Sequence, residues 1–311
     1  MNHFADRLTA AIRSKGNALC VGLDPRWESL PIALRTKYKD GTLRGAARAF
    51  EEFCIRVLDV VAPLVPVVKP QSAFFELCGP AGMDALQAVL RRAREKGLVT
   101  ILDGKRNDIA STATAYADAA FGGVRIDDGV YPIWDADALT INAYLGRDSV
   151  SAFLESARRS ARGLFVLVRT SNPGAGQFQD LETDGRPLFM HVAAAVQNWT
   201  RENLGQSGFG DVGAVVGATH PCELPQIRKA LPEGYILLPG LGAQGGTAAD
   251  TAAAFREDGL GAIANSARGI TFCYPPEERE WEARIETETR KVIDELAAAT
   301  PMGRLRSHVS T

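Results

Sequence analysis

Two carboxylates and an ammonium group lie close together in the segment Asp103-Gly104-Lys105-Arg106-Asn107-Asp108. The apolar, β-branched run before this segment predicts a strand, and the pattern from Ile109 onward predicts a helix. Asp103 and Lys105 are two residues apart, so both should project from one face at the carboxyl end of the strand. Such a cluster can stabilise charge that develops during a reaction, although a D-x-K-x-x-D pattern alone also occurs in ordinary solvated loops.

Two further polar side chains follow apolar runs in the same way. Asp24 ends the run 19–24, and Lys69 ends the apolar part of the run 65–70. Lys69 is either a rim charge that pairs with a neighbour or a site residue, and the next strand offers Asp103 as its partner. The order Lys69, Asp103, Lys105, Asp108 would alternate cations and anions, which keeps both lysines charged in a pocket that holds little water.

Eight short apolar runs must position these side chains. Their hydrophobicity is continuous, which is typical of parallel strands buried on both faces, and Ala-rich helical patterns lie between most of them. The runs are 19–24, 65–70, 99–103, 138–142, 164–170, 212–218, 235–239 and 261–265. Polar residues recur at their carboxyl ends, and no Pro/Gly/Ser-rich linker divides the chain, so we predict an α/β fold of the (β/α)8 (TIM) barrel type. A doubly wound sheet is the competing architecture.

The same reading predicts one domain over residues 1–311. We expect a helix over 1–16, an amphipathic helix over 277–298 and a flexible tail over 299–311. Two segments, 121–137 and 172–191, are longer than connections require, and they are either mobile lids or plain insertions.

The composition argues against several classes of partner. The 311 residues are 46% hydrophobic and 23% charged with a net charge of −2, which indicates neither nucleic-acid nor acidic-membrane binding. The five cysteines form no C-x-x-C, so we expect no disulfide framework and no zinc site. Because no stretch of about 18 apolar residues occurs, we expect a soluble, cytoplasmic protein.

A glycine-rich segment follows the seventh run. It contains a G-x-G-x-x-G pattern, but a dinucleotide fingerprint belongs in the first βα unit of its fold. In a (β/α)8 barrel, the loops after strands seven and eight often bind phosphate through backbone N–H groups, and Arg268 follows the eighth run. A turn and a surface arginine are the simpler explanations of each feature alone. Their joint position favours a phosphate site with Gly242, Gly245, Gly246 and Arg268.

Taken together, these motifs resemble orotidine 5′-phosphate decarboxylase, and most closely its longer bacterial subgroup. The resemblance extends from Asp24 to Arg268, through Val21-Gly-Leu-Asp24-Pro, Lys69-Pro-Gln-Ser-Ala-Phe-Phe-Glu76, Asp103-x-Lys105-x-x-Asp108-Ile-x-x-Thr112, Arg169-Thr-Ser171-Asn-Pro-Gly-Ala175, Val216-Gly-Ala-Thr219 and Pro239-Gly-x-Gly-Ala-Gln244-Gly-Gly. Gly104 and Ala143 depart from the pattern, where Ala and Pro are expected. Both changes are non-polar, so they affect loop rigidity rather than the reaction.

The resemblance implies that the chain decarboxylates orotidine 5′-phosphate to uridine 5′-monophosphate (UMP) in de novo pyrimidine biosynthesis, without a cofactor or metal. It also implies a homodimer in which Asp108 and Thr112 reach the neighbouring active site. The remaining implied roles are proton donor to C6 for Lys105, a position beside the substrate carboxylate for Asp103, ribose binding for Asp24 and Lys69, pyrimidine binding for Ser171, and phosphate binding for Gln244 and Arg268.

Two other functions stay open from the sequence. Sugar-phosphate decarboxylases and aldolases resemble the chain at D-x-K-x-x-D, but they are assisted by a metal ion. A barrel that binds nucleotide phosphate without catalysis is the alternative from another class. Turnover of orotidine 5′-phosphate, with and without a chelator, separates the three.

Overall fold

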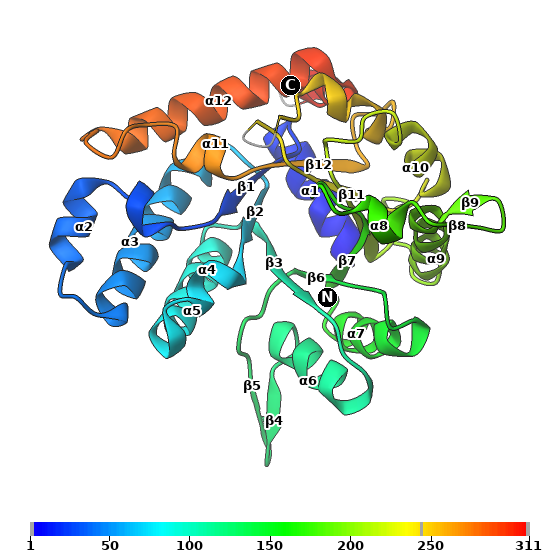
Figure 1. Cartoon of the computed structure of the whole chain (residues 1–311), viewed down its shortest axis with the longest axis horizontal. Helices are drawn as coiled ribbons and strands as arrows, with labels where there is room; N and C mark the ends of the chain where they lie inside the picture. The colour runs from blue at the N-terminus through cyan, green and yellow to red at the C-terminus, as the bar shows by residue number, and fades with distance from the viewer. Residues whose placement is uncertain (1–2, 243–244, 309–311) are drawn as a thin grey trace.

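Eight parallel strands close into a barrel in the computed structural model, which describes residues 3–242 and 245–308. The strands follow one another around the barrel in chain order, with β1 beside β12 (Figure 1). Their bounds are β1 Leu19–Leu23, β2 Val67–Pro70, β3 Val99–Arg106, β6 Ala138–Ile141, β7 Gly163–Arg169, β10 Val212–Val216, β11 Ile236–Pro239 and β12 Ala262–Ser266. The predicted (β/α)8 barrel is therefore confirmed, and the doubly wound sheet is excluded.

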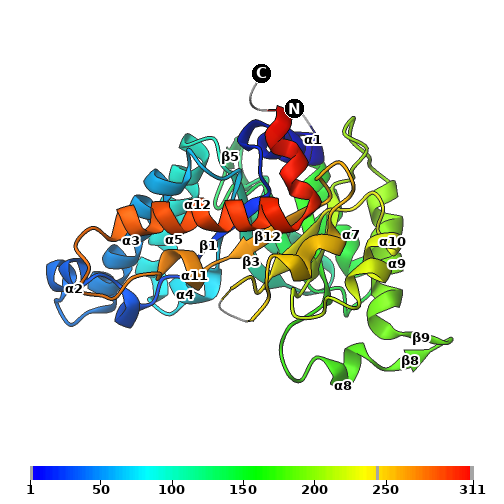
Figure 2. The ribbon, with the colours of Figure 1, turned by 90° about the horizontal axis from the view of Figure 1, so that it is seen from above.

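Helices surround the barrel, and the long α12 crosses its outside (Figure 2). The longer helices are α1 Phe4–Lys15, α3 Leu43–Val61, α5 Gly79–Glu95, α6 Ala110–Ala120, α7 Arg147–Arg159, α9 Leu188–Arg201 and α12 Trp281–Ala299. Shorter helices are α2 Ile32–Tyr38, α4 Ser72–Glu76, α8 Gly176–Gln179, α10 Leu224–Ala230 and α11 Arg268–Thr271, with 3-10 turns at Trp27–Ser29, Ala249–Ala254 and Pro301–His308. Among the described residues, no helix is both long and apolar enough to cross a membrane.

Helix α1 covers the amino end of the barrel. The ring of Phe4 packs edge-on against Phe165 of β7, with 6.2 Å between ring centroids. A Cβ atom at Gly163, the first residue of β7, would lie 2.1 Å from the Phe4 ring, so only glycine fits there. Because α1 covers the amino end, the barrel is open only at the carboxyl ends of its strands.

The carboxyl-terminal segment differs from the sequence prediction. We expected a flexible tail from residue 299, but Pro301–His308 form a 3-10 helix with Met302 and Leu305 buried. The Met302 sulfur also accepts a hydrogen bond from the backbone N–H of Ala18 at 3.2 Å. The prediction is therefore wrong over this helix, and residues 309–311 lie outside the described part of the chain.

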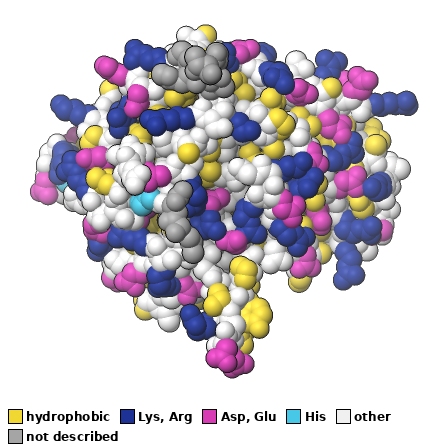
Figure 3. Space-filling view, turned by 180° about the vertical axis from the view of Figure 1, so that it is seen from behind, with side chains coloured by type: hydrophobic (Ala, Val, Ile, Leu, Met, Phe, Trp, Pro, Cys, Tyr) yellow, Lys and Arg dark blue, Asp and Glu magenta, His cyan; other side chains and the backbone are white. Residues whose placement is uncertain are grey.

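The two long segments each contain a β-hairpin. In 121–137, β4 (Val124–Ile126) pairs with β5 (Gly129–Tyr131), and in 172–191, α8 precedes β8 (Glu182–Thr183) and β9 (Arg186–Pro187). The β4–β5 hairpin projects from the barrel, and apolar side chains gather at its position in Figure 3. Its exposed apolar residues are Val124, Ile126, Val130 and Tyr131.

Strand β7 carries one extra residue near its carboxyl end. Leu167 pairs with Val215 of β10, but the next β10 residue, Val216, pairs with Arg169. A β-bulge of this kind redirects the side chains that follow it, and bulges are common beside active sites.

Candidate active site

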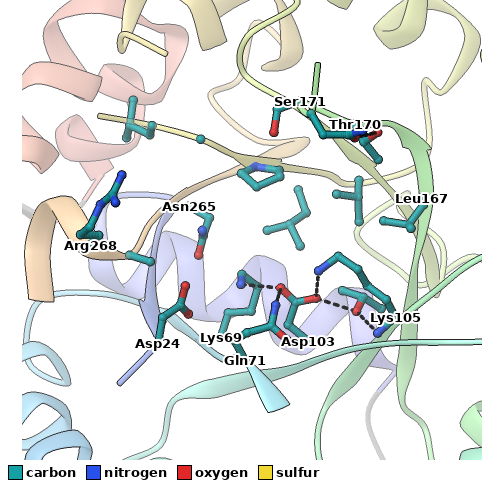
Figure 4. A pocket seen from close by; sticks show the side chains of 18 of the residues that line it. Asp24, Lys69, Gln71, Asp103, Lys105, Leu167, Thr170, Ser171, Asn265 and Arg268 are labelled. Atoms are coloured by element: carbon teal, nitrogen blue, oxygen red, sulfur yellow. Dashed lines mark hydrogen bonds and ion pairs between the residues drawn. The ribbon is translucent and has the colours of Figure 1, made fainter. Parts of the chain in front are cut away.

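A cavity of about 640 Å³ opens at the carboxyl ends of the strands. Leu167, Val215 and Leu237, from three neighbouring strands, give it an apolar wall. Polar and charged side chains line much of the rest of the cavity, among them Asp24, Lys69, Asp103, Lys105, Ser171, Asn265 and Arg268 (Figure 4). Residues far apart in the chain thus meet around one cavity; Asp24 and Arg268, for example, are 244 positions apart.

Asp103 is the centre of the charged cluster. Its Oδ2 atom accepts hydrogen bonds from Nζ of Lys69 at 2.7 Å and from Nε2 of Gln71 at 2.9 Å. Its Oδ1 atom accepts from Nζ of Lys105 at 2.6 Å and from Oγ1 of Thr140 at 2.8 Å. The two ammonium groups therefore lie on either side of one carboxylate, in the alternating order that the sequence predicted for these three residues.

Burial and charge oppose each other within this cluster. Burial alone would raise the pKa of Asp103, but Lys69 and Lys105 outweigh burial and hold that pKa below the usual carboxyl range. Burial would likewise lower the pKa of Lys69, whereas Asp103 and Asp24 raise it above the ordinary value. Lys69 and Asp103 are only 4% and 5% exposed, so both charges depend on each other to persist away from water.

The backbone at Lys105 is held in a strained conformation. Its φ of 44° lies in the left-handed region, which costs a residue with a side chain about 1 kcal/mol. The hydroxyl of Thr140 accepts the backbone N–H of Lys105 at 2.9 Å while donating to Asp103. Thr140 therefore fixes both the carboxylate and the peptide that precedes the Lys105 side chain, which stays 45% exposed at the cavity.

Asp24 and Asn265 line the cavity, and each has a buried side-chain oxygen atom. The Oδ1 atom of each is buried and has no hydrogen-bond partner in the described structure. Burial raises the pKa of Asp24, and the nearby Lys69 only partly offsets this effect. Two buried acceptors without partners in a polar cavity are well placed to accept hydrogen bonds from ligand hydroxyl or N–H groups.

Ser171 and Arg268 occupy other parts of the cavity wall. Ser171 follows β7 and lies across the cavity from Lys69 and Asp103, and Arg268 begins α11 after β12 (Figure 4). Arg26 and Asn172 also line the cavity. The sequence reasoning did not identify Arg26, Gln71, Thr140, Asn172 or Asn265, although Asn265 ends the eighth predicted run.

The glycine-rich loop lies between two cavities, and its first residues, Gly240 and Leu241, line the central one. Gly242, Gly245 and Gly246 line a separate, adjacent cavity of about 360 Å³, and in the described chain they do not face the central one. Their backbone N–H groups donate within the loop, to Gly246, Gly242 and Gly240 respectively. Gly242 and Gly245 have φ values of 80° and 91°, so they are needed for the turn itself. Gln244, the other predicted phosphate ligand here, lies outside the described residues.

Asp108 and Thr112 do not line the cavity of their own chain. Asp108 accepts the backbone N–H of Ile109 at 2.8 Å, just before α6 begins, and Thr112 is exposed on α6. Ile109, next to Asp108 in the chain, and Tyr116, one turn after Thr112 on α6, are exposed apolar residues, as are Tyr144 and Leu145 in the loop after β6.

Comparison with known proteins agrees with this geometry. The model of the orotidine 5′-phosphate decarboxylase / HUMPS family matches residues 17–282. The chain belongs to the orotidine 5′-phosphate decarboxylase family. It is 47% identical over 303 residues to the orotidine 5′-phosphate decarboxylase of Rhodopirellula baltica, covering 95% of this chain and 99% of the relative. Its relative in Caldicellulosiruptor bescii, of the same name, is 38% identical and covers 88% of this chain.

Solved structures give the same fold. The OMP decarboxylase of Leishmania donovani superposes with a TM-score of 0.73 at 31% sequence identity, and the match covers 96% of this chain and 98% of that one. The family resemblance inferred from the sequence motifs is therefore confirmed, and the protein is an enzyme of this family.

Proposed function

We propose that the cavity binds orotidine 5′-phosphate, and that Lys105 donates the proton that replaces the departing carboxylate at C6. The observation that carries this proposal is the carboxylate of Asp103, which accepts hydrogen bonds from Nζ of both Lys69 and Lys105 at one cavity wall. In this arrangement the pyrimidine lies near Lys105 and the apolar wall, and the phosphate lies toward Arg268.

The chemistry requires a charge of this kind. When the bond from C6 to the carboxylate breaks, its electron pair stays in an sp² orbital perpendicular to the ring π system, so the ring cannot delocalise it. Unit charges about 4 Å apart attract by about 4 kcal/mol at an effective dielectric constant near 20. The Lys105 ammonium stabilises the carbanion in this way and then transfers a proton from Nζ to C6, which leaves UMP, carbon dioxide and a neutral lysine that solvent reprotonates.

The other residues bind and orient the substrate. The unpartnered acceptor of Asp24 and the ammonium of Lys69 suit the ribose hydroxyls, and Ser171 suits the pyrimidine edge. Arg268 suits the phosphate, and Gln244 is proposed to assist it. Binding energy from this remote phosphate can organise the charged wall around the reacting atoms.

The active enzyme is proposed to be a homodimer. Asp108 and Thr112 lie outside their own cavity, with the exposed apolar side chains of Ile109 and Tyr116 next to them along the chain, and an exposed apolar surface is typical of one that a partner subunit covers. A two-fold arrangement would bring these residues to the partner's cavity, next to Lys105 of that subunit.

A spectrophotometric assay of the purified protein with orotidine 5′-phosphate tests the reaction. Conversion to UMP at the same rate with and without a chelator supports the proposal. Failure to turn over this substrate, with UMP still bound, would indicate a non-catalytic nucleotide-binding barrel. Turnover of a sugar phosphate that the chelator abolishes would indicate the metal-assisted enzymes instead.

A further inference from the structure

Arg169 is a buried cation that the proposed reaction does not use. It ends β7, is only 4% exposed and does not line the central cavity. On a regular strand it would share a face with Leu167, which does line the cavity. The bulge between these residues breaks that alternation, so the guanidinium of Arg169 lies behind the cavity wall.

The guanidinium joins segments that come from different parts of the chain. Its Nε and Nη2 atoms donate to the two carboxylate oxygens of Glu223, just before α10, at 2.8 and 3.0 Å. Its Nη1 atom lies 2.6 Å from Oδ1 of Asp180, which follows α8, and its Cζ atom lies 5.1 Å from the ring centroid of Phe189 in α9. Arg169 therefore attaches the segment 172–187 to the outer wall of the barrel.

This attachment extends to the cavity through Gln179. The Oε1 atom of Gln179 lies 3.5 Å from Nη1 of Arg169 and accepts the backbone N–H of Thr170 at 3.0 Å. Its Nε2 atom donates to the Thr170 hydroxyl at 2.7 Å, and Nε2 of His220 lies 3.0 Å from the Thr170 carbonyl oxygen. Every polar group of Thr170 is thus engaged, and Thr170, Ser171 and Asn172 line the cavity.

We propose that Arg169 is a positioning residue that, through Gln179, fixes the cavity rim at Thr170–Asn172 so that Ser171 meets the pyrimidine. Without the guanidinium, Glu223 and Asp180 lose their shared cation, and the segment that carries Gln179 is no longer held against the end of β7. The inference rests on the proposed contact between Ser171 and the pyrimidine.

The test compares two ligands that differ only in the base. UMP requires the rim, whereas ribose 5-phosphate presents the same sugar and phosphate without a pyrimidine. Arg169→Met and Gln179→Ala should each weaken UMP binding about tenfold, the effect of about one net hydrogen bond, while ribose 5-phosphate binding stays within about twofold. Arg169→Lys, which keeps the charge but not the bidentate pairing, should fall between Arg169→Met and the wild type.

Two further variants complete the design. The double variant Arg169→Met/Gln179→Ala should bind UMP as tightly as whichever single variant binds it less tightly. The two effects should not add, because both residues act through the same contact with Thr170. Arg158→Met is the matched control, since Arg158 pairs with the buried Asp211 but does not line the cavity, and it should leave both affinities unchanged. Retained ribose 5-phosphate binding also shows that each variant is folded.

The positioning role would be overturned if Arg169→Met weakened the binding of UMP and of ribose 5-phosphate equally, or weakened the binding of neither. Ser171→Ala separates this failure from failure of the proposed function. If Ser171→Ala weakens UMP binding and Arg169→Met does not, only the role of Arg169 is wrong. If Ser171→Ala has no effect, the pyrimidine contact is wrong, and the route from Arg169 to the base is overturned with it.

Discussion

Lys69 and Asp103 join the neighbouring strands β2 and β3 through an ion pair, with 2.7 Å between Nζ and Oδ2 and both side chains almost completely buried. A buried pair of this kind contributes little net stability when intact, but removing one partner leaves the other charge without compensation. The pair therefore links the stability of the barrel to the charge state of its active site.

Replacement of Asp103 should destabilise the protein. Asp103→Asn leaves Lys69 buried beside a neutral amide, and we expect a loss of about 3 kcal/mol in the free energy of unfolding near neutral pH. The lysines lower the pKa of Asp103 in the folded protein. As the pH falls, the Asp103 carboxylate is therefore protonated in the unfolded chain before it is protonated in the folded protein. The wild type should thus have the higher free energy of unfolding above about pH 4, and its difference from Asp103→Asn should shrink below that pH. Unfolding by guanidinium chloride over a pH series would measure this difference. A difference that does not change on acidification would contradict this account.

Asp24→Asn should have the opposite effect on stability. Burial raises the pKa of Asp24, so the unfolded chain releases this proton first as the pH rises; the folded state is therefore increasingly destabilised from about pH 4 upward, and the cost is complete once the pH exceeds the raised pKa. We expect Asp24→Asn to be more stable by about 1 kcal/mol near neutral pH, with the gain disappearing below about pH 4. UMP affinity should nevertheless fall about tenfold, because a ribose acceptor is lost. A variant that is less stable at neutral pH would show that Asp24 has a compensating partner.

Loss of Lys105 should affect turnover and leave ligand binding intact. Lys105→Ala removes both the proton donor and the stabilising charge, so kcat should fall at least about a thousandfold. The Kd of UMP should change by no more than about threefold, since phosphate and ribose contacts remain. Lys37→Ala, which removes an exposed lysine paired with Glu52 on the outside of the barrel, is the control. Near-normal turnover in Lys105→Ala would eliminate Lys105 as the donor.

Mixed dimers can test whether each cavity needs residues from both subunits. Lys105→Ala and Asp108→Ala should each be inactive as homodimers. After the two variants exchange subunits, a mixed dimer has both lesions in one cavity and neither in the other, so the mixture should recover about one quarter of wild-type activity. Light scattering confirms the dimer, and an unmixed sample is the control. No recovery despite subunit exchange would place Asp108 in its own cavity.

The sequence predicted those features that depend on spacing along one strand. Parallel barrel strands are buried on both faces, so they appear as continuous apolar runs, and all eight runs coincide with barrel strands. The two-residue interval between Asp103 and Lys105 likewise placed their side chains together, as their hydrogen bond confirms.

Features that depend on neighbouring strands were not predictable in this way. Thr140 resembles any strand threonine until β6 is placed beside β3, and the outward position of Arg169 depends on the pairing of β7 with β10. Phosphate binding by the glycine loop stays a prediction, and the N–H groups of Gly242, Gly245 and Gly246 donate within the loop itself. The 3-10 helix at the carboxyl end was missed because only Met302 and Leu305, one 3-10 turn apart, are apolar enough to anchor a polar segment.

The hydrogen bonds around Asp103 also limit what this residue can do. A carboxylate offers about four acceptor positions, and Lys69, Gln71, Lys105 and Thr140 occupy that number. No lone pair is left to take a proton from a substrate or to bind a water molecule for attack. Asp103 is therefore a permanent negative charge rather than a general base, and its influence on a bound ligand is exerted through space.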